Sequence, residues 1–129
     1  MRKFLFSFDG RLGRAPYWLA LLAVLLIDSV VFGIVGGLEL FDGDALAVEP
    51  GSLSWPWALL VVPPSLWIGL VVSVKRWHDR NKSGWWVLVN LVPVVGWLWQ
   101  LIECGFLRGT TGPNRFGQDP LRLRAIASA

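Results

Sequence analysis

The stretch APYWLALLAVLLIDSVVFGIVGGL, residues 15–38, holds a single charged residue, Asp28, near its middle. A helix rises about 1.5 Å per residue, so roughly 20 residues cross the ~30 Å hydrocarbon core of a bilayer. Burying the thirteen Leu, Ile, Val and Phe residues between Leu19 and Leu38 contributes roughly 4–8 kcal/mol, more than the roughly 2.5–3.5 kcal/mol cost of a central Asp. Because backbone groups cannot stay unpaired in lipid, we predict a membrane-spanning helix here. A cleaved signal peptide is the alternative for residues 1–30, although no A-x-A site follows its apolar core.

Two further apolar stretches follow. Residues 53–74 carry no charge, and residues 84–107 carry only Glu103. The whole chain is 54% hydrophobic and 16% charged, whereas an average soluble domain is about 45–50% apolar and about 25% charged. Six of the nine tryptophans lie near the ends of the three stretches, at the level where amphipathic rings prefer to sit. The composition therefore predicts one all-α integral-membrane domain over residues 1–129, with three apolar helical segments as membrane spans over about 15–38, 53–74 and 84–107.

The charged residues separate by segment. Residues 1–14, 75–83 and 108–129 each carry four basic residues against one acidic residue, whereas residues 39–52 carry four acidic residues and no basic one. Basic segments stay on the cytoplasmic side of the membrane. We therefore expect a multi-pass protein with a cytoplasmic N-terminus, a cytoplasmic loop at 75–83 and an external acidic segment.

The third stretch leaves two topologies open. If residues 84–107 cross the membrane fully, the basic tail 108–129 ends outside, against the charge rule. Pro93 removes a helix donor and Gly96 permits a turn, so the stretch can instead fold as a re-entrant hairpin broken at these two residues. The continuous apolar length favours a single kinked span, and the charge of the tail favours the hairpin.

The segment KRWHDRNKSG, residues 75–84, is the densest group of polar residues. His78 and Asp79 are suited to acid–base chemistry, and the adjacent arginines to binding phosphate. The plainer interpretation is that a cytoplasmic loop must be basic and serves as an anchor. Because the chain has one cysteine, Cys104, and one histidine, an internal disulfide, a Cys-rich zinc site and a multi-His site are excluded.

Four polar residues fall within the apolar stretches. Ionisable residues in such positions are functional candidates by default. Asp28 is suited to carrying protons or ions, and the alternative is that the four residues make polar contacts between helices. These intramembrane candidates are Asp28, Asn90, Gln100 and Glu103.

Four motifs carry a family resemblance. They are Phe8-x-Gly10-Arg11-x-x-Arg14-x-x-Tyr17-Trp18, Arg76-x-His78-Asp79-x-Asn81-x-Ser83-Gly84-Trp85-Trp86, Pro93-x-x-Gly96 and Gly112-x-Asn114-Arg115-Phe116-Gly117-x-Asp119-Pro120. With these motifs in this order, the chain resembles the domain-of-unknown-function 805 family of small bacterial inner-membrane proteins. The acidic segment around 42–51 is the main departure. The resemblance implies a bacterial inner (plasma) membrane location and no particular reaction.

The resemblance also suggests that the polar motifs belong together. If the tail is cytoplasmic, as the hairpin requires, the motifs can form one composite site. Its members would be Arg11, Arg14, Arg76, His78, Asp79, Asn114 and Arg115.

The leading functional hypothesis is a non-enzymatic module that binds anionic lipid headgroups or a membrane partner through its cytoplasmic basic face. One alternative is a small transporter or an ion- or proton-conducting subunit that uses Asp28. Another is a lipid-modifying enzyme that uses His78 and Asp79. The bilayer is the expected partner, and a homo-oligomer is plausible because two or three helices bury few polar groups. We expect no cofactor, no metal and no nucleic-acid partner.

Overall fold

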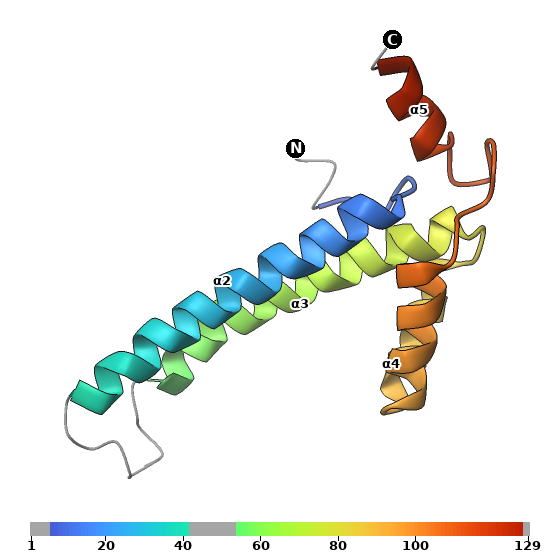
Figure 1. The fold of residues 1–129 in the computed structure, drawn as a ribbon. Coiled ribbons are helices and arrows are strands. Elements are labelled where there is room, and N and C mark those ends of the chain that lie inside the picture. Colours follow the sequence, from blue (N-terminus) through green and yellow to red (C-terminus); the bar gives the residue numbers. More distant parts are fainter. Residues whose placement is uncertain (1–5, 42–53, 128–129) are drawn as a thin grey trace.

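The computed structural model describes residues 6–41 and 54–127 of the chain, and in these residues it is helical with no β-strand (Figure 1). Its elements are α2 (Arg14–Phe41), α3 (Ser54–Asp79), the 3₁₀ helix η1 (Gly84–Leu91), α4 (Val95–Gln100), the π-helical η2 (Leu101–Phe106) and α5 (Pro120–Ala127). The all-α prediction is confirmed for this part of the chain. The acidic segment 42–51 lies outside the described residues.

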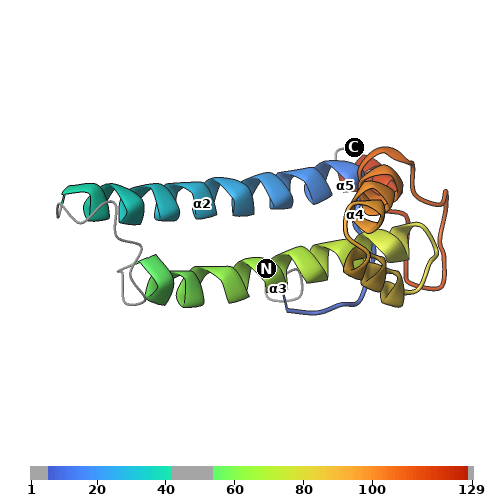
Figure 2. The same cartoon turned by 90° about the horizontal axis from the view of Figure 1, so that it is seen from below.

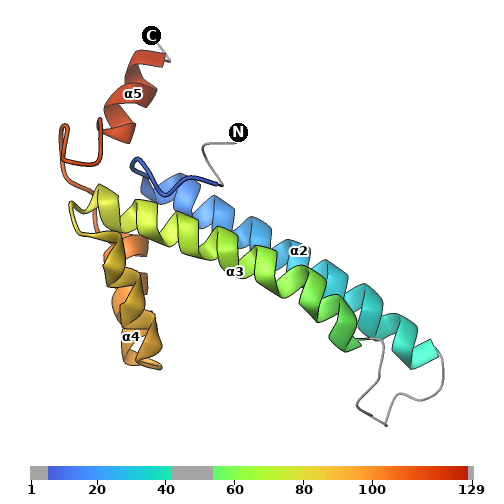
Figure 3. The same ribbon diagram turned by 180° about the vertical axis from the view of Figure 1, so that it is seen from behind.

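The helices α2 and α3 form a long antiparallel pair, as all three ribbon views show (Figures 1, 2 and 3). Both are long and apolar enough to cross a membrane, over Arg14–Leu38 and Ala58–Asp79. Most of the large apolar side chains along α2 are exposed. This pattern is typical of helices whose apolar surface faces lipid rather than a protein core.

The end of α3 corrects one predicted boundary. Residues 75–83 were expected to form a loop, but α3 continues through Asp79, and only residues 80–83 separate it from η1. The reason is burial: Arg76 and Trp77 are fully buried in the last turns, and Lys75 is 4% exposed. Tertiary packing therefore extends the helix beyond its apolar run.

The third apolar stretch turns back on itself rather than continuing as one helix. The turn lies between η1 and α4, where Val94 takes a positive φ of 64° and Gly96 packs directly on the backbone of Val89. A Cβ at residue 96 would collide with the Val89 carbonyl, so this turn requires glycine. Asn90 and Gln100 join the two arms through their side-chain amides.

The buried core lies at the end of the molecule where α2 begins and α3 ends, which we call the polar end. Its central cluster comprises Leu12, Tyr17, Val72, Trp77 and Cys104. Both arms of the hairpin and the tail leave from this end, and α5 projects away from the helix pair (Figure 3). The residues before α2 also run back along α3, where the ring of Phe8 packs edge-on against Trp67 at 5.4 Å.

Candidate functional site

Arg76 occupies the centre of the polar end. Its guanidinium is fully buried and donates to four oxygens. Nε reaches the carbonyl of Cys104 at 2.6 Å, and the two terminal nitrogens reach the carbonyls of Leu12 and Leu107 and the carboxylate of Asp79. A buried charge is tolerated only when it is paired and hydrogen-bonded. This one side chain therefore ties α3 to the N-terminal segment and to the end of the hairpin.

Asp79 lies between two guanidinium groups. Arg11 places Nε and Nη2 each 3.0 Å from Asp79 Oδ1, and Arg76 pairs with Oδ2. Arg11 also donates to the backbone carbonyls of Thr110, Gly112 and Gly117 in the tail. Asp79 therefore links α3 to both the N-terminal segment and, through Arg11, the tail.

The tail packs on the end of α3 through a tight turn. Asn114 Nδ2 donates to the backbone carbonyl of His78 at 2.9 Å and to Thr110 Oγ1 at 2.9 Å. The ring of Phe116 stacks on the imidazole of His78, with centroids 3.8 Å apart and planes at 4°. Arg115 donates to the carbonyl of Asn81 at 3.3 Å and lies over the Phe116 ring. The tail is thus bound to the loop that follows α3.

The seven residues of the predicted composite site all lie at the polar end. Six of them are linked by contacts around the end of α3. Arg11 and Arg76 pair with Asp79, Asn114 binds the backbone carbonyl of His78, and Arg115 binds that of Asn81. Arg14 lies beside them and donates to the carbonyl of Phe106 at 3.2 Å. The members of the connected set are Arg11, Arg76, His78, Asp79, Asn114 and Arg115.

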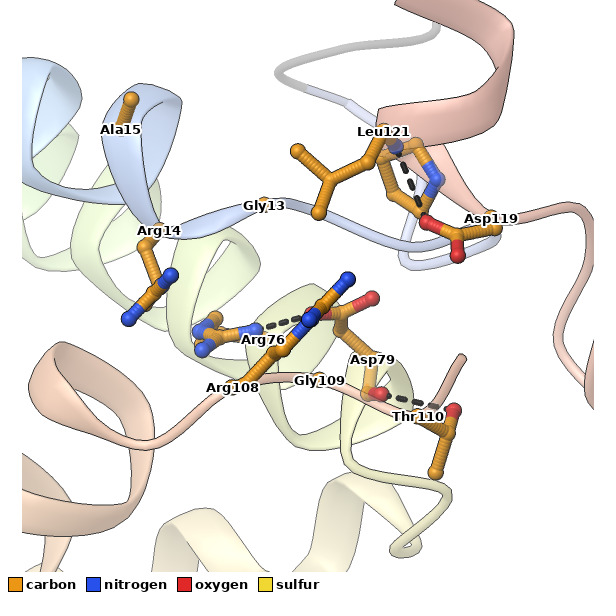
Figure 4. Close-up of a pocket in the computed structure, with 11 residues that line it drawn as sticks. Gly13, Arg14, Ala15, Arg76, Asp79, Arg108, Gly109, Thr110, Asp119 and Leu121 are labelled. Atoms are coloured by element: carbon orange, nitrogen blue, oxygen red, sulfur yellow. Dashed lines mark hydrogen bonds and ion pairs between the residues drawn. The ribbon is translucent and has the colours of Figure 1, made fainter. Parts of the chain in front are cut away.

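A pocket of about 190 Å³ opens beside this network. The side chains of Arg14, Arg76 and Arg108 lie around it, together with Asp79 and Asp119 (Figure 4). Arg11 and Arg76 already pair with Asp79, and Asp119 offsets part of the positive charge that Arg14 and Arg108 bring to the pocket. A half-open pocket with three guanidinium groups in its wall suits a phosphate or carboxylate.

Two backbone features shape the pocket wall. Gly109 passes so close to the Asp79 carboxylate that an added Cβ would collide with it. Asp119 accepts the backbone N–H groups of Leu121 at 2.9 Å and Gly112 at 3.1 Å. These two hydrogen bonds, the one from Leu121 first, hold the pKa of Asp119 below its ordinary value. Asp119 thereby fixes the start of α5 at the rim of the pocket.

Sequence reasoning missed Arg108, Gly109 and Asp119 as pocket residues. Arg108 counted only as one of the basic residues that set the charge of the tail. Asp119 belonged to the fourth motif, but the motif did not reveal which backbone groups it binds. Gly109 lay just outside that motif, and its role depends on a chain passing beside α3, which no local signal predicts.

The intramembrane candidates separate into three places. Glu103 pairs with Arg80 at 2.9 Å and Lys82 at 2.9 Å, which brings it to the polar end. Asn90 and Gln100 lie together in the hairpin, and Gln100 donates to Ser73 of α3 at 3.0 Å. Asp28 lies 14 residues beyond the start of α2, about 21 Å along the helix axis. Its Oδ1 accepts the hydroxyl of Ser65 at 2.7 Å.

The geometry of His78 and Asp79 does not favour catalysis. Although they are neighbours in sequence, the imidazole of His78 stacks on Phe116 while the Asp79 carboxylate binds two arginines. The Nδ1 atom of His78 is buried without a hydrogen-bond partner. No group of three His, Cys, Asp or Glu side chains suited to a metal gathers within residues 6–41 and 54–127.

Comparison with known proteins places the chain among membrane proteins of unknown function. Residues 5–118 match the family described as protein of unknown function, DUF805. The chain is 35% identical to the inner membrane protein YhaH of Escherichia coli K12, over 88% of this chain and 87% of the relative. It is also 35% identical to the inner membrane protein YhaI of the same strain, over 88% of this chain and 86% of YhaI. The uncharacterized protein YiiR is 28% identical over 92% of this chain and 89% of its own length. No solved structure matches the chain.

Proposed function

This chain belongs to the DUF805 family of membrane proteins of unknown function, and from that premise we propose that it is a non-enzymatic module that binds the phosphate of an anionic lipid headgroup. The observation that carries the proposal is the pocket of about 190 Å³ lined by Arg14, Arg76 and Arg108. Arginine is favoured at phosphate sites because its planar fork matches the geometry of the anion.

The proposal includes a topology in which the polar end faces the cytoplasm and the hairpin enters the membrane from that side and returns. A 2.9 Å hydrogen bond between Asn114 and the His78 backbone supports it, because a ~30 Å hydrocarbon core cannot separate the two residues. The eight-residue η1 reaches about 16 Å at 3₁₀ rise, roughly half of a bilayer. With this topology, all three basic segments lie on the cytoplasmic side, as the charge rule requires.

The position of the pocket also supports a lipid headgroup. Arg14 and Ala15, the first residues of α2, line it, and the amide groups of a first helical turn attract anions. Because α2 enters the membrane directly after this turn, the pocket lies at the level of the lipid phosphates. Each basic residue near a membrane surface contributes about 1 kcal/mol of attraction to anionic lipid.

The test compares binding of phosphatidylglycerol and phosphatidylcholine to the purified protein in detergent by native mass spectrometry. Arg14→Gln and Arg108→Gln should each weaken phosphatidylglycerol binding about fivefold, the equivalent of about 1 kcal/mol. Arg122→Gln is the matched control, since Arg122 is exposed on α5 and does not line the pocket. Equal losses in the control would show that the pocket does not bind the lipid, and equal binding of the two lipids would show that it does not select an anionic headgroup.

Transport through Asp28 is the second candidate, and one contact favours it. Asp28 lies deep along α2, lines a large groove and is hydrogen-bonded to Ser65. A carboxylate in that position is a candidate proton carrier. A proton flux in proteoliposomes that Asp28→Asn abolishes, with phosphatidylglycerol binding unchanged, would favour transport over headgroup binding.

A further inference from the structure

A second cavity, of about 710 Å³, lies between the hairpin and the α2–α3 pair. It falls within the range of about 300–1,000 Å³ that is typical of small-molecule sites. Its walls come from α2, α3, η1, α4 and the start of η2, and most of its lining residues are apolar. It shares no lining residue with the arginine pocket. We refer to this cavity as the lateral groove.

Most polar residues that line the lateral groove gather at one end of it, and we call them the polar cluster: Tyr17, Ser73, Asn90 and Gln100. Asp28 lies 11 residues further along α2 than Tyr17, about 16 Å along the axis. Ser73 precedes the end of α3 by six residues, or about 9 Å. The polar cluster therefore lies at the end of the groove that is nearer to the end of α3, and the apolar walls lead away from it along α2 and α3.

The polar cluster leaves one acceptor unused. Asn90 Nδ2 donates to Gln100 Oε1, and Gln100 Nε2 donates to Ser73 Oγ at 3.0 Å. Asn90 Oδ1 is buried and has no hydrogen-bond partner. A buried acceptor without a donor is costly and calls for an explanation. A ligand that brings a hydroxyl group to this end of the groove would satisfy it.

Charge separates this groove from the arginine pocket. Among the described residues that line the groove none is basic, and Asp28 is the one acidic residue in its wall. A phosphate would find no cationic partner there. The groove is therefore complementary to a molecule with a long apolar body, no negative charge and a hydrogen-bond donor at one end.

We propose that the lateral groove binds a neutral membrane lipid with a free hydroxyl, of the diacylglycerol class, with its hydroxyl at Asn90 and its acyl chains along α2 and α3. The glycerol hydroxyl of such a lipid would meet the polar cluster, and its chains would follow the apolar walls. This site goes beyond the proposed headgroup site, since it takes a different lipid and uses different residues.

The first experiment blocks the groove. An added Cβ at Gly69 meets no atom within 4 Å, so Gly69→Leu introduces a side chain at the wall of the groove with no clash at its Cβ. Gly33→Leu is the matched control, because Gly33 is equally open but does not line the groove. The probe is a diacylglycerol with a diazirine in one acyl chain, photo-crosslinked to the full-length protein in phosphatidylcholine nanodiscs. We expect Gly69→Leu to lose most of the crosslinking and Gly33→Leu to retain it. Equal yields from the two variants would overturn the proposal.

The second experiment tests the hydroxyl. Dioleoylglycerol should displace the probe about two- to tenfold better than its 3-O-methyl ether, the range expected for one hydrogen bond. This preference should disappear in Asn90→Leu. Equal competition by the ether, by phosphatidylcholine or by phosphatidylglycerol would mean that the groove takes any acyl chain, which refutes the proposal. Arg14→Gln should leave the crosslinking unchanged, so that failure here and failure of the headgroup site are separate results.

Discussion

The two ends of α3 place polar and apolar residues in opposite ways. In its last turns, Arg76 and Asp79 are buried and fully engaged with oxygens and guanidinium groups. Further back toward its start, Leu59, Leu60 and Leu66 are more than 60% exposed. Exposing these leucine side chains to water would be unfavourable, but contact with lipid carries no such free-energy cost. The comparison teaches that protein contacts hold the polar end together, whereas the remainder of the helix pair relies on the bilayer.

The largest effect should come from removing the central charge of the polar end. Arg76→Leu leaves Asp79 with one arginine and orphans the carbonyls of Cys104, Leu107 and Leu12. Breaking a buried ion pair costs about 3–5 kcal/mol. We therefore expect a large fall in the thermal unfolding temperature of the purified protein in detergent.

A matched substitution on the helix pair should change the thermal unfolding temperature little. Leu26 is 64% exposed on α2, so Leu26→Ala leaves no cavity in the protein. If Leu26→Ala lowered the unfolding temperature as much as Arg76→Leu, the contrast between the two regions would be wrong.

A smaller effect is expected where the tail passes α3. In Gly109→Ala the new methyl group meets the Asp79 carboxylate, and overpacking of this kind costs about 1–3 kcal/mol. Release of the tail should speed tryptic cleavage at Arg115 and Arg122, which are exposed but held in ordered backbone in the wild type. Gly36→Ala is the control, because an added Cβ there meets nothing and alanine favours a helix. Tryptic cleavage at the same rate in both variants would show that the tail does not depend on this close approach.

The smallest effect should appear as a pH dependence at the rim of the pocket. The folded pKa of Asp119 is depressed below its ordinary value of 3.8 by the N–H groups of Leu121 and Gly112. Its contribution to stability is therefore present above that ordinary value and is lost as the pH falls through the folded pKa. Amide hydrogen exchange at Leu121 should rise relative to the intrinsic rate below about pH 4 in the wild type, while Asp119→Asn should show no such step. An equal step in the variant would assign the change to another group.

Hydropathy and charge were sufficient to predict the helical class and the first span, because apolar length is a local property. The motifs also indicated that Arg11, His78 and Asn114 belong together. The extension of α3 to Asp79 was not predictable, because it depends on carbonyls supplied by distant segments. Nor did the apolar pattern of the third stretch reveal that its first arm is a 3₁₀ helix and that its second passes from α-helix to π-helix, since the turn between them depends on the close packing of Gly96 on Val89.

The contacts of Arg11 have a consequence for how the protein is made. Its acceptors at Gly112 and Gly117 are 101 and 106 residues away in the chain, so they are synthesised last. Until they emerge from the ribosome, Arg11 has only part of its final set of partners, and water must solvate it, whereas the four acceptors of Arg76 all precede Gly112 in the chain. We therefore expect the helix pair to exist first as an open intermediate in which Arg11 is hydrated. Completion of the chain closes it, and a truncation before Gly112 would leave that intermediate exposed to quality-control proteases.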